Sequence, residues 1–148
     1  MALLQIAEPG QSPLPHQVRR AVGIDLGTTN SLVATVRGGR AAALPDANGA
    51  VMLPSVVHYS AGNPPLVGAA ACLLAGEHPA DTLMSVKRFM GRGAADAAID
   101  ARRAHYQLVE GDGGLVRFAT SGGEFTPVEV SAQILGVLRQ RAIATLGG

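Results

Sequence analysis

The chain has 148 residues, of which 47% are apolar and only 3% aromatic, with no tryptophan. A chain of this length buries about 70% of its unfolded surface, so the composition predicts a packed globular unit rather than a disordered one. Twelve basic and eleven acidic side chains leave a net charge of +1. The sequence lacks the basic stripe of nucleic-acid-binding proteins, and its single cysteine, Cys72, excludes an internal disulfide.

Residues 1–20 predict an irregular N-terminal arm. They contain Pro9, Pro13 and Pro15 and no sustained apolar run, unlike a secretory signal. No apolar run of about eighteen residues, the length that a transmembrane helix needs, occurs in the sequence. We therefore expect a cytoplasmic protein that binds neither membrane nor nucleic acid.

Alternating apolar residues begin at Ala21 and predict an antiparallel meander. Its strands and turns are bounded by glycine, asparagine and hydroxyl residues, which favour tight connections. The expected strands are residues 21–26, 31–36 and 40–44, and the turns between them are residues 27–30 and 38–39.

The middle of the chain predicts short strands and helices in alternation. Asp81 is expected to cap a helix over residues 82–90, with Gly91 just after its end. Glycines at residues 111–114 favour a hairpin. The remaining expected elements are strands over residues 54–59, 106–109 and 115–120, and helices over residues 69–75 and 94–103.

The last segment carries the clearest helix signal. Thr126 and Glu129 fit a capping box, with Pro127 at the first helical position and Phe125 and Val130 at the two staple positions. An apolar stripe follows at helical spacing and is expected to face the core. It consists of Ile134, Leu135, Leu138, Ala142 and Leu146, and Gly147 would end the helix.

The turn after the first strand is the first candidate for chemistry. Asp25 ends that strand, and Gly27, Thr28, Thr29 and Asn30 follow. Backbone N–H groups at a glycine turn can bind an anion, while a neighbouring carboxylate can hold a hydrated divalent cation. The alternative is a plain hairpin turn, in which the aspartate and threonine side chains bond to nearby backbone groups.

Lys87 is the second candidate because it is the only lysine beside eleven arginines. An ammonium is a compact charge that fits beside a terminal phosphate and a water, where a planar guanidinium fits differently. The alternative is a solvated lysine that pairs with the dipole in the last turn of its helix.

Several other chemistries lack their motifs. The sequence contains neither a G-x-x-x-x-G-K-[ST] loop nor a G-x-G-x-x-G after a strand. The four histidines show no metal-ligand spacing, and no Ser, His and Asp set forms a recognisable triad.

Four segments in order along the chain resemble the DnaK-type, 70-kDa heat-shock chaperones. They are residues 21–37, 53–57, 78–92 and 127–135, and residues 94–117 are the variable stretch between them. The opening residues 1–6 and 8–10 resemble the arm of the branch that serves iron–sulfur cluster assembly.

The resemblance implies an α/β fold of the actin-like (ribonuclease H-like) ATPase type, here incomplete. Residues 21–52 and 127–148, an antiparallel meander and a helix, would form part of a lower subdomain. Residues 53–126 would form a small α+β upper subdomain.

The resemblance also implies roles for single residues. Gly27, Thr28, Thr29 and Asn30 would contact the phosphates of ATP or ADP. Asp25 would hold Mg²⁺ through water, and K⁺ is a further candidate ion. Lys87 would act as the catalytic residue that orients the attacking water and stabilises charge on the γ-phosphate.

For the full-length parent, the resemblance implies ATP hydrolysis that drives client binding and release. The partners would be a J-domain co-chaperone and an iron–sulfur scaffold protein. The second phosphate loop, the adenosine-binding segments and the peptide-binding domain of that family are absent here, so we expect the chain alone to be inactive. Its sheet should also leave a strand edge and apolar surface uncovered.

Two other functions stay open on the residues. A sugar kinase could share the Asp25-x-Gly27-x-Thr29 hairpin. A free-standing interaction domain without catalysis would also fit the composition, and it should unfold cooperatively as a monomer.

Overall fold

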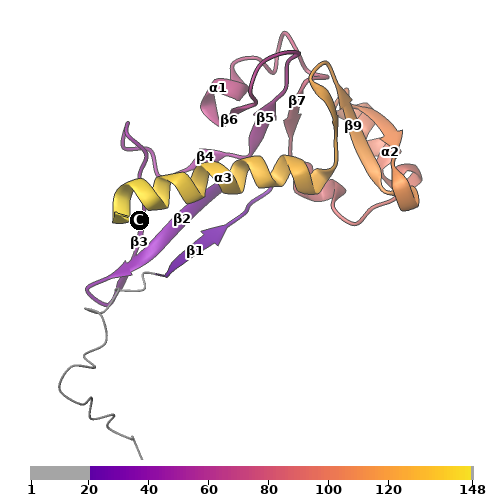
Figure 1. Ribbon diagram of the computed structural model, residues 1–148. Helices are drawn as coiled ribbons and strands as arrows, with labels where there is room; N and C mark the ends of the chain where they lie inside the picture. Colours follow the sequence, from indigo (N-terminus) through magenta and orange to yellow (C-terminus); the bar gives the residue numbers. More distant parts are fainter. Residues whose placement is uncertain (1–20, 148) are drawn as a thin grey trace, which may run out of the picture.

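The computed structural model of the chain describes residues 21–147, apart from the side chains of Ala94 and Asp112. The arm expected over residues 1–20 lies outside the described part. Within that part, short antiparallel sheets and a long C-terminal helix build a mixed α/β unit (Figure 1). No helix within residues 21–147 is long and apolar enough to cross a membrane.

The first sheet is the predicted meander. Strand β2 lies at its centre, where its alternate residues are buried because one face packs against the C-terminal helix. Asp25 pairs with Leu32 across the first turn. The strands are β1 Val22–Asp25, β2 Asn30–Arg37 and β3 Arg40–Ala43, and β4 Leu53–Pro54 pairs with the start of β2.

The second sheet has the strand order β6-β5-β7, which leaves β7 at an edge. All three residues of β5 are buried. Helix α1 packs against β5 and β6. The elements are β5 Val56–His58, β6 Leu66–Val67, α1 Ala69–Cys72 and β7 Thr82–Met84.

The third sheet is a three-stranded meander with helix α2 packed on β8 and β9. Phe118 of β9 is fully buried and stands edge-on to Phe89 and Tyr106. The elements are α2 Ala94–Arg103, β8 Gln107–Glu110, the 3₁₀ turn η2 Asp112–Gly114, β9 Val116–Thr120 and β10 Gly123–Phe125.

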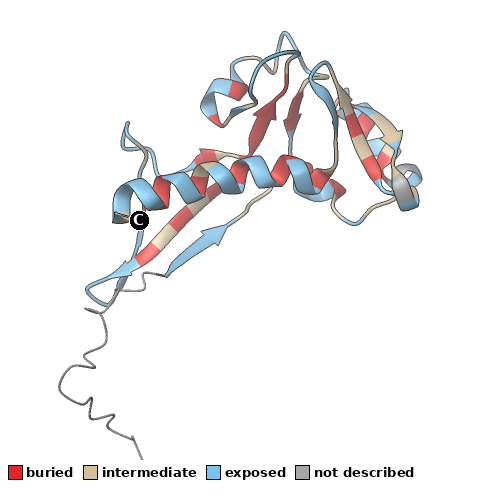
Figure 2. Cartoon of the chain, viewed as in Figure 1, coloured by how far each residue is buried: buried red, intermediate tan, exposed pale blue. Residues whose placement is uncertain are grey.

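Helix α3, Pro127–Leu146, crosses the molecule and contacts all three sheets (Figure 1). Its start is the predicted capping box, since the Thr126 and Glu129 side chains each bond to the other's backbone N–H. Ile134, Leu138 and Ala142 are buried, as expected. Figure 2 shows buried positions alternating with exposed ones along this helix.

The predicted helix over residues 82–90 is wrong. Residues 82–84 form β7 on the edge of β5, and a 3₁₀ turn, η1 Val86–Phe89, follows. Between them Ser85 is left-handed, with φ 56°, which no helix can contain. Asp81 caps nothing: its carboxylate accepts hydrogen bonds from the N–H and Oγ of Ser121, 40 residues away.

Other differences are smaller. The strand expected over residues 54–59 breaks at Ser55 into β4 and β5, and the helix expected over residues 69–75 is shortened to α1. Strands β6 and β10 are too short to show a period in the sequence. The meander strands, α2, the β8–β9 hairpin and α3 agree with prediction to within one or two residues.

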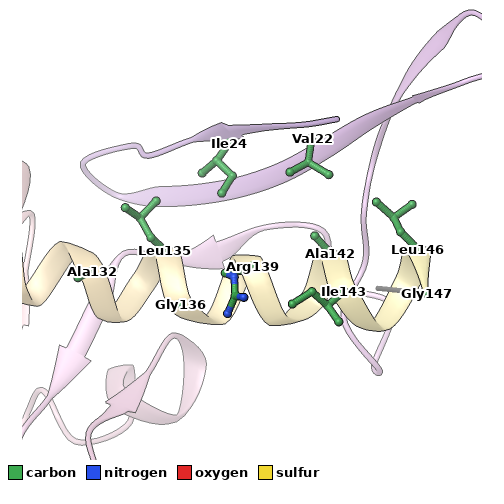
Figure 3. A pocket seen from close by; sticks show the side chains of 10 residues that line it. All are labelled: Val22, Ile24, Ala132, Leu135, Gly136, Arg139, Ala142, Ile143, Leu146 and Gly147. Carbon is green, nitrogen blue, oxygen red and sulfur yellow. The ribbon is translucent and has the colours of Figure 1, made fainter. Parts of the chain in front are cut away.

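Leu135 is a further correction, because it does not face the core. It is 37% exposed and lines an open apolar groove of about 720 Å³ between α3 and β1. Across the groove lie Val22 and Ile24 of β1, which point toward the helix (Figure 3). Among the described strands β1 pairs with β2 alone, so the groove follows an open sheet edge.

Candidate functional site

The turn between β1 and β2 is held through its carbonyl groups. Lys87 Nζ donates a hydrogen bond to the carbonyl of Leu26 at 2.9 Å. Ser55 donates twice, from Oγ to the carbonyl of Gly27 at 2.9 Å and from its N–H to that of Thr29 at 2.8 Å. The turn is therefore fixed from one side by two segments distant in sequence.

Ser55 extends this anchor into the core. Its Oγ lies 2.8 Å from Oγ of Ser31, and both side chains are buried. Because the single hydroxyl proton of Ser55 goes to the Gly27 carbonyl, Ser31 is the donor in this pair. Sequence reasoning did not single out Ser55. The only available signal was a small hydroxyl next to the two valines of a predicted strand.

Gly27 is required by the shape of the turn. A Cβ at this position would lie 2.1 Å from the carbonyl oxygen of Asn30, far inside contact distance. Gly23, two residues before the end of β1, has nothing within 4 Å of its own Cβ position. The glycine of the predicted motif is therefore a steric necessity of the hairpin, independent of any ligand.

Within residues 21–147, the side chains predicted to hold metal and phosphate make no hydrogen bond to the protein. Asp25, Thr29 and Asn30 are exposed and Thr28 is half-buried. None of these four side chains bonds to another residue in the described part of the chain. The simple-turn interpretation, in which they satisfy nearby backbone groups, does not describe this structure.

Lys87 reaches the turn from η1. Val86 and Phe89 bury their side chains, each 3% exposed, and the two residues between them, Lys87 and Arg88, are exposed. Lys87 does not pair with a helix end, since η1 is a single 3₁₀ turn. The structure thus brings together two features that lie 61 residues apart in sequence.

Arg92 ties the Lys87 segment to α2. Its guanidinium donates to the carboxylate of Asp100 at 2.6 Å and also to the carbonyl of Asp96. It donates a longer bond, 3.5 Å, to the carbonyl of Arg88. The hydrogen bond from Arg92 lowers the pKa of Asp100, because it stabilises the charged carboxylate.

Comparison with known proteins shows the family of the chain. A family model described as Hsp70 protein matches residues 21–148. The chain belongs to the Hsp70 family. The match covers the hairpin, Ser55, the Lys87 segment and α3 in one span.

Several curated Hsp70 relatives resemble the chain over its whole length. A chaperone protein HscA homolog of Bordetella pertussis is 58% identical over 147 residues, 99% of this chain. Those of Pseudomonas putida and Laribacter hongkongensis are each 57% identical over 148 residues. The chain spans 23–24% of the length of these relatives.

Proposed function

We propose that the chain is the first part of the ATPase domain of an Hsp70-type chaperone that couples ATP hydrolysis to client binding and release. Iron–sulfur cluster maturation is the proposed process, on the strength of the HscA homologs. The observation that carries the proposal is the 2.9 Å bond from Lys87 Nζ to Leu26, which joins the only lysine to the glycine turn.

The proposed architecture is part of one lobe of an actin-like ATPase. Residues 21–52 and 127–148 form the lower subdomain and residues 53–126 the upper one. The family match and the mixed α/β fold support this division. Lys87 of the upper subdomain and the turn of the lower one meet at their junction.

The residues present fit a magnesium nucleotide. With its carbonyls engaged by Lys87 and Ser55, the turn has backbone N–H and hydroxyl groups left to offer to phosphate oxygens. Gly27, Thr28, Thr29 and Asn30 would provide those contacts to ATP or ADP. The exposed carboxylate of Asp25 would hold Mg²⁺ through water, which suits a hard cation that keeps its waters. K⁺ remains a proposed additional ion.

Bound ATP supplies the phosphoanhydride bond, and the protein supplies position and charge. Lys87 would leave the Leu26 carbonyl and turn its ammonium toward the γ-phosphate, where it orients the attacking water. Its positive charge stabilises the charge on the transferred group. Such fixed electrostatics account for most of the rate that enzymes gain in phosphoryl transfer.

The relatives are about four times as long as this chain, so the proposed partners and activity belong to the full-length protein. A J-domain co-chaperone and an iron–sulfur scaffold protein would act through the full-length protein, in the cytoplasm. The groove along β1 would be covered there by the strand that follows α3. The 148 residues alone should neither bind ATP tightly nor hydrolyse it, and micromolar binding in a calorimetric titration would disprove this.

The decisive experiment compares Lys87→Ala with Arg88→Ala in the full-length protein. Both remove an exposed cation from η1, but only Lys87 bonds to the turn. Lys87→Ala should lower phosphate release about 100-fold or more while ATP still binds. Arg88→Ala should stay near wild type.

Two results would overturn this function. Near-normal turnover by Lys87→Ala would show that Lys87 is not the catalytic residue. Formation of a phosphosugar by the wild-type protein, in place of free phosphate, would favour the sugar-kinase alternative.

A further inference from the structure

We propose that Tyr106 is a positioning residue for Lys87, acting through the backbone of Met84; the inference rests on the proposed function of Lys87. Tyr106 lies just before β8 and is 8% exposed. Within the described residues, its hydrogen bonds and ring contacts go to Met84, Ala101, Phe89 and Phe118, and not to the turn or to Lys87. Its influence on the site would pass through the chain segment that carries the lysine.

The Tyr106 hydroxyl binds both polar groups of one residue. The N–H of Met84 donates to Tyr106 Oη at 2.6 Å, and Oη donates to the carbonyl of Met84 at 3.1 Å. Met84 is the last residue of β7, which is an edge strand. One hydroxyl thus replaces the missing neighbouring strand at the point where β7 ends.

The chain changes direction directly after this clamp. Ser85 takes a left-handed conformation, with φ 56°, and η1 begins at Val86. A non-glycine residue keeps such a conformation only where surrounding contacts impose it, and such residues gather at functional sites. The Met84 clamp is the contact that immediately precedes this bend.

The ring of Tyr106 holds the other end of η1. Phe89 lies with its ring centre 6.1 Å from that of Tyr106, and Phe118 packs edge-on to Tyr106 at 5.5 Å. Tyr106 therefore contacts the chain on both sides of Lys87. Its own backbone is fixed by a 2.9 Å bond from its N–H to the carbonyl of Ala101 in α2.

Removal of the hydroxyl alone should break the contact of Tyr106 with Met84 and keep its contact with Phe89. In Tyr106→Phe the ring still packs on Phe89 and Phe118, but Met84 loses both bonds. Residues 84–86 can then rotate, and the Lys87 ammonium moves from its place beside the turn. A misplacement of about 1 Å can cost about 100-fold in rate, so a tenfold loss is a moderate expectation.

The chain offers a matched control in Tyr59, its only other tyrosine. The Tyr59 hydroxyl is also buried, but it has no hydrogen-bond partner among residues 21–147. Its ring stacks on Phe125 at 3.8 Å, a contact that phenylalanine retains. Tyr59→Phe therefore removes a buried hydroxyl without breaking a bond.

The test measures steady-state ATP hydrolysis by the full-length protein, below the melting temperature of every variant. Tyr106→Phe should lower kcat about tenfold with KM for ATP unchanged. Tyr59→Phe should leave both unchanged. Amide exchange at Met84 should accelerate in Tyr106→Phe and stay slow in Tyr59→Phe.

A double variant separates positioning from general destabilisation. Added to Lys87→Ala, Tyr106→Phe should cause no further loss, because the group that it positions is gone. The inference is wrong if Tyr106→Phe keeps kcat within about twofold of wild type, or if it lowers the residual activity of Lys87→Ala by the same factor. Near-normal turnover by Lys87→Ala alone would instead overturn the proposed function.

Discussion

The two halves of the candidate site are held in different ways. The turn at residues 26–29 has no room for a side chain at Gly27, and its backbone carbonyls accept hydrogen bonds from Ser55 and Lys87. The segment at residues 81–92 has its own short-range backbone bonds, from the N–H groups of Arg88, Met90 and Arg92 to carbonyls three residues before them. Side-chain bonds also link it to the rest of the molecule: Asp81 accepts from Ser121, Met84 bonds to Tyr106, and Arg92 donates to Asp100 of α2.

This difference suggests a division of labour. A phosphate-binding turn must be rigid, because its donors have to converge on one anion before it arrives. The lysine lies on η1, which packs against α3 and is linked to α2 through Arg92 and to Tyr106 through Phe89. A rearrangement of that packing would move the lysine and leave the turn intact.

The largest expected effect breaks the turn. Gly27→Ala places a Cβ 2.1 Å from the Asn30 carbonyl, so the backbone must shift. We expect ATP affinity of the full-length protein to fall at least about 100-fold and unfolding free energy to fall by about 1–3 kcal/mol. Calorimetric titration and urea unfolding measure these.

Gly23→Ala is the control for this change, since its Cβ meets nothing within 4 Å. It should bind ATP like wild type. Equal affinity of Gly27→Ala and Gly23→Ala would show that the turn adapts, and that its rigidity has no part in binding.

A smaller effect tests how the lysine segment is held. If Asp81 is a cross-link to Ser121, Asp81→Ala and Ser121→Ala should be non-additive, with a coupling energy of about 1 kcal/mol. If Asp81 capped a helix instead, the loss of unfolding free energy in Asp81→Ala would be the same with or without Ser121→Ala. Chemical denaturation of the two single variants and the double variant measures the coupling, and additivity would contradict the cross-link.

The smallest effect concerns the capping box at the start of α3. Hydrogen bonds from the Thr126 N–H and hydroxyl lower the pKa of Glu129. Stability from this lowered pKa is present above the ordinary value of 4.5 and is lost as the pH falls through the lower folded value. Glu129→Gln keeps an acceptor but cannot titrate.

Melting temperatures should be measured between pH 7 and pH 3. At neutral pH, wild type should melt at a temperature higher than that of Glu129→Gln, by about 2 °C or less. The difference should shrink in acid. A constant difference at every pH would mean that the charge on Glu129 contributes nothing.

Sequence reasoning succeeded where the signal was local. Three features depend on only a few neighbouring residues, and all three were predicted. They are the turn at Gly27, the Thr126–Glu129 capping box and the alternation of β2. The helix predicted over residues 82–90 failed because an edge strand of three residues has no period to detect. The conformation of that segment depends on its contacts with β5 and Tyr106, which a local sequence pattern cannot show.

The site shows the same division. Asp25, residues 27–30 and Lys87 were each proposed from the sequence, and their roles stay predictions. Their meeting point was implied by the family resemblance alone, since spacing cannot bring residues 61 positions apart together. Ser55 and Tyr106 went unnoticed because a serine in a strand and a tyrosine before one are ordinary in any sequence.

The most direct measurement is a structure of the full-length protein with Mg²⁺ and a non-hydrolysable ATP analogue. We expect the phosphates to lie against the N–H and hydroxyl groups of residues 27–30, with Lys87 turned from the Leu26 carbonyl to the γ-phosphate. A triphosphate bound elsewhere, with Lys87 still on Leu26, would contradict this expectation.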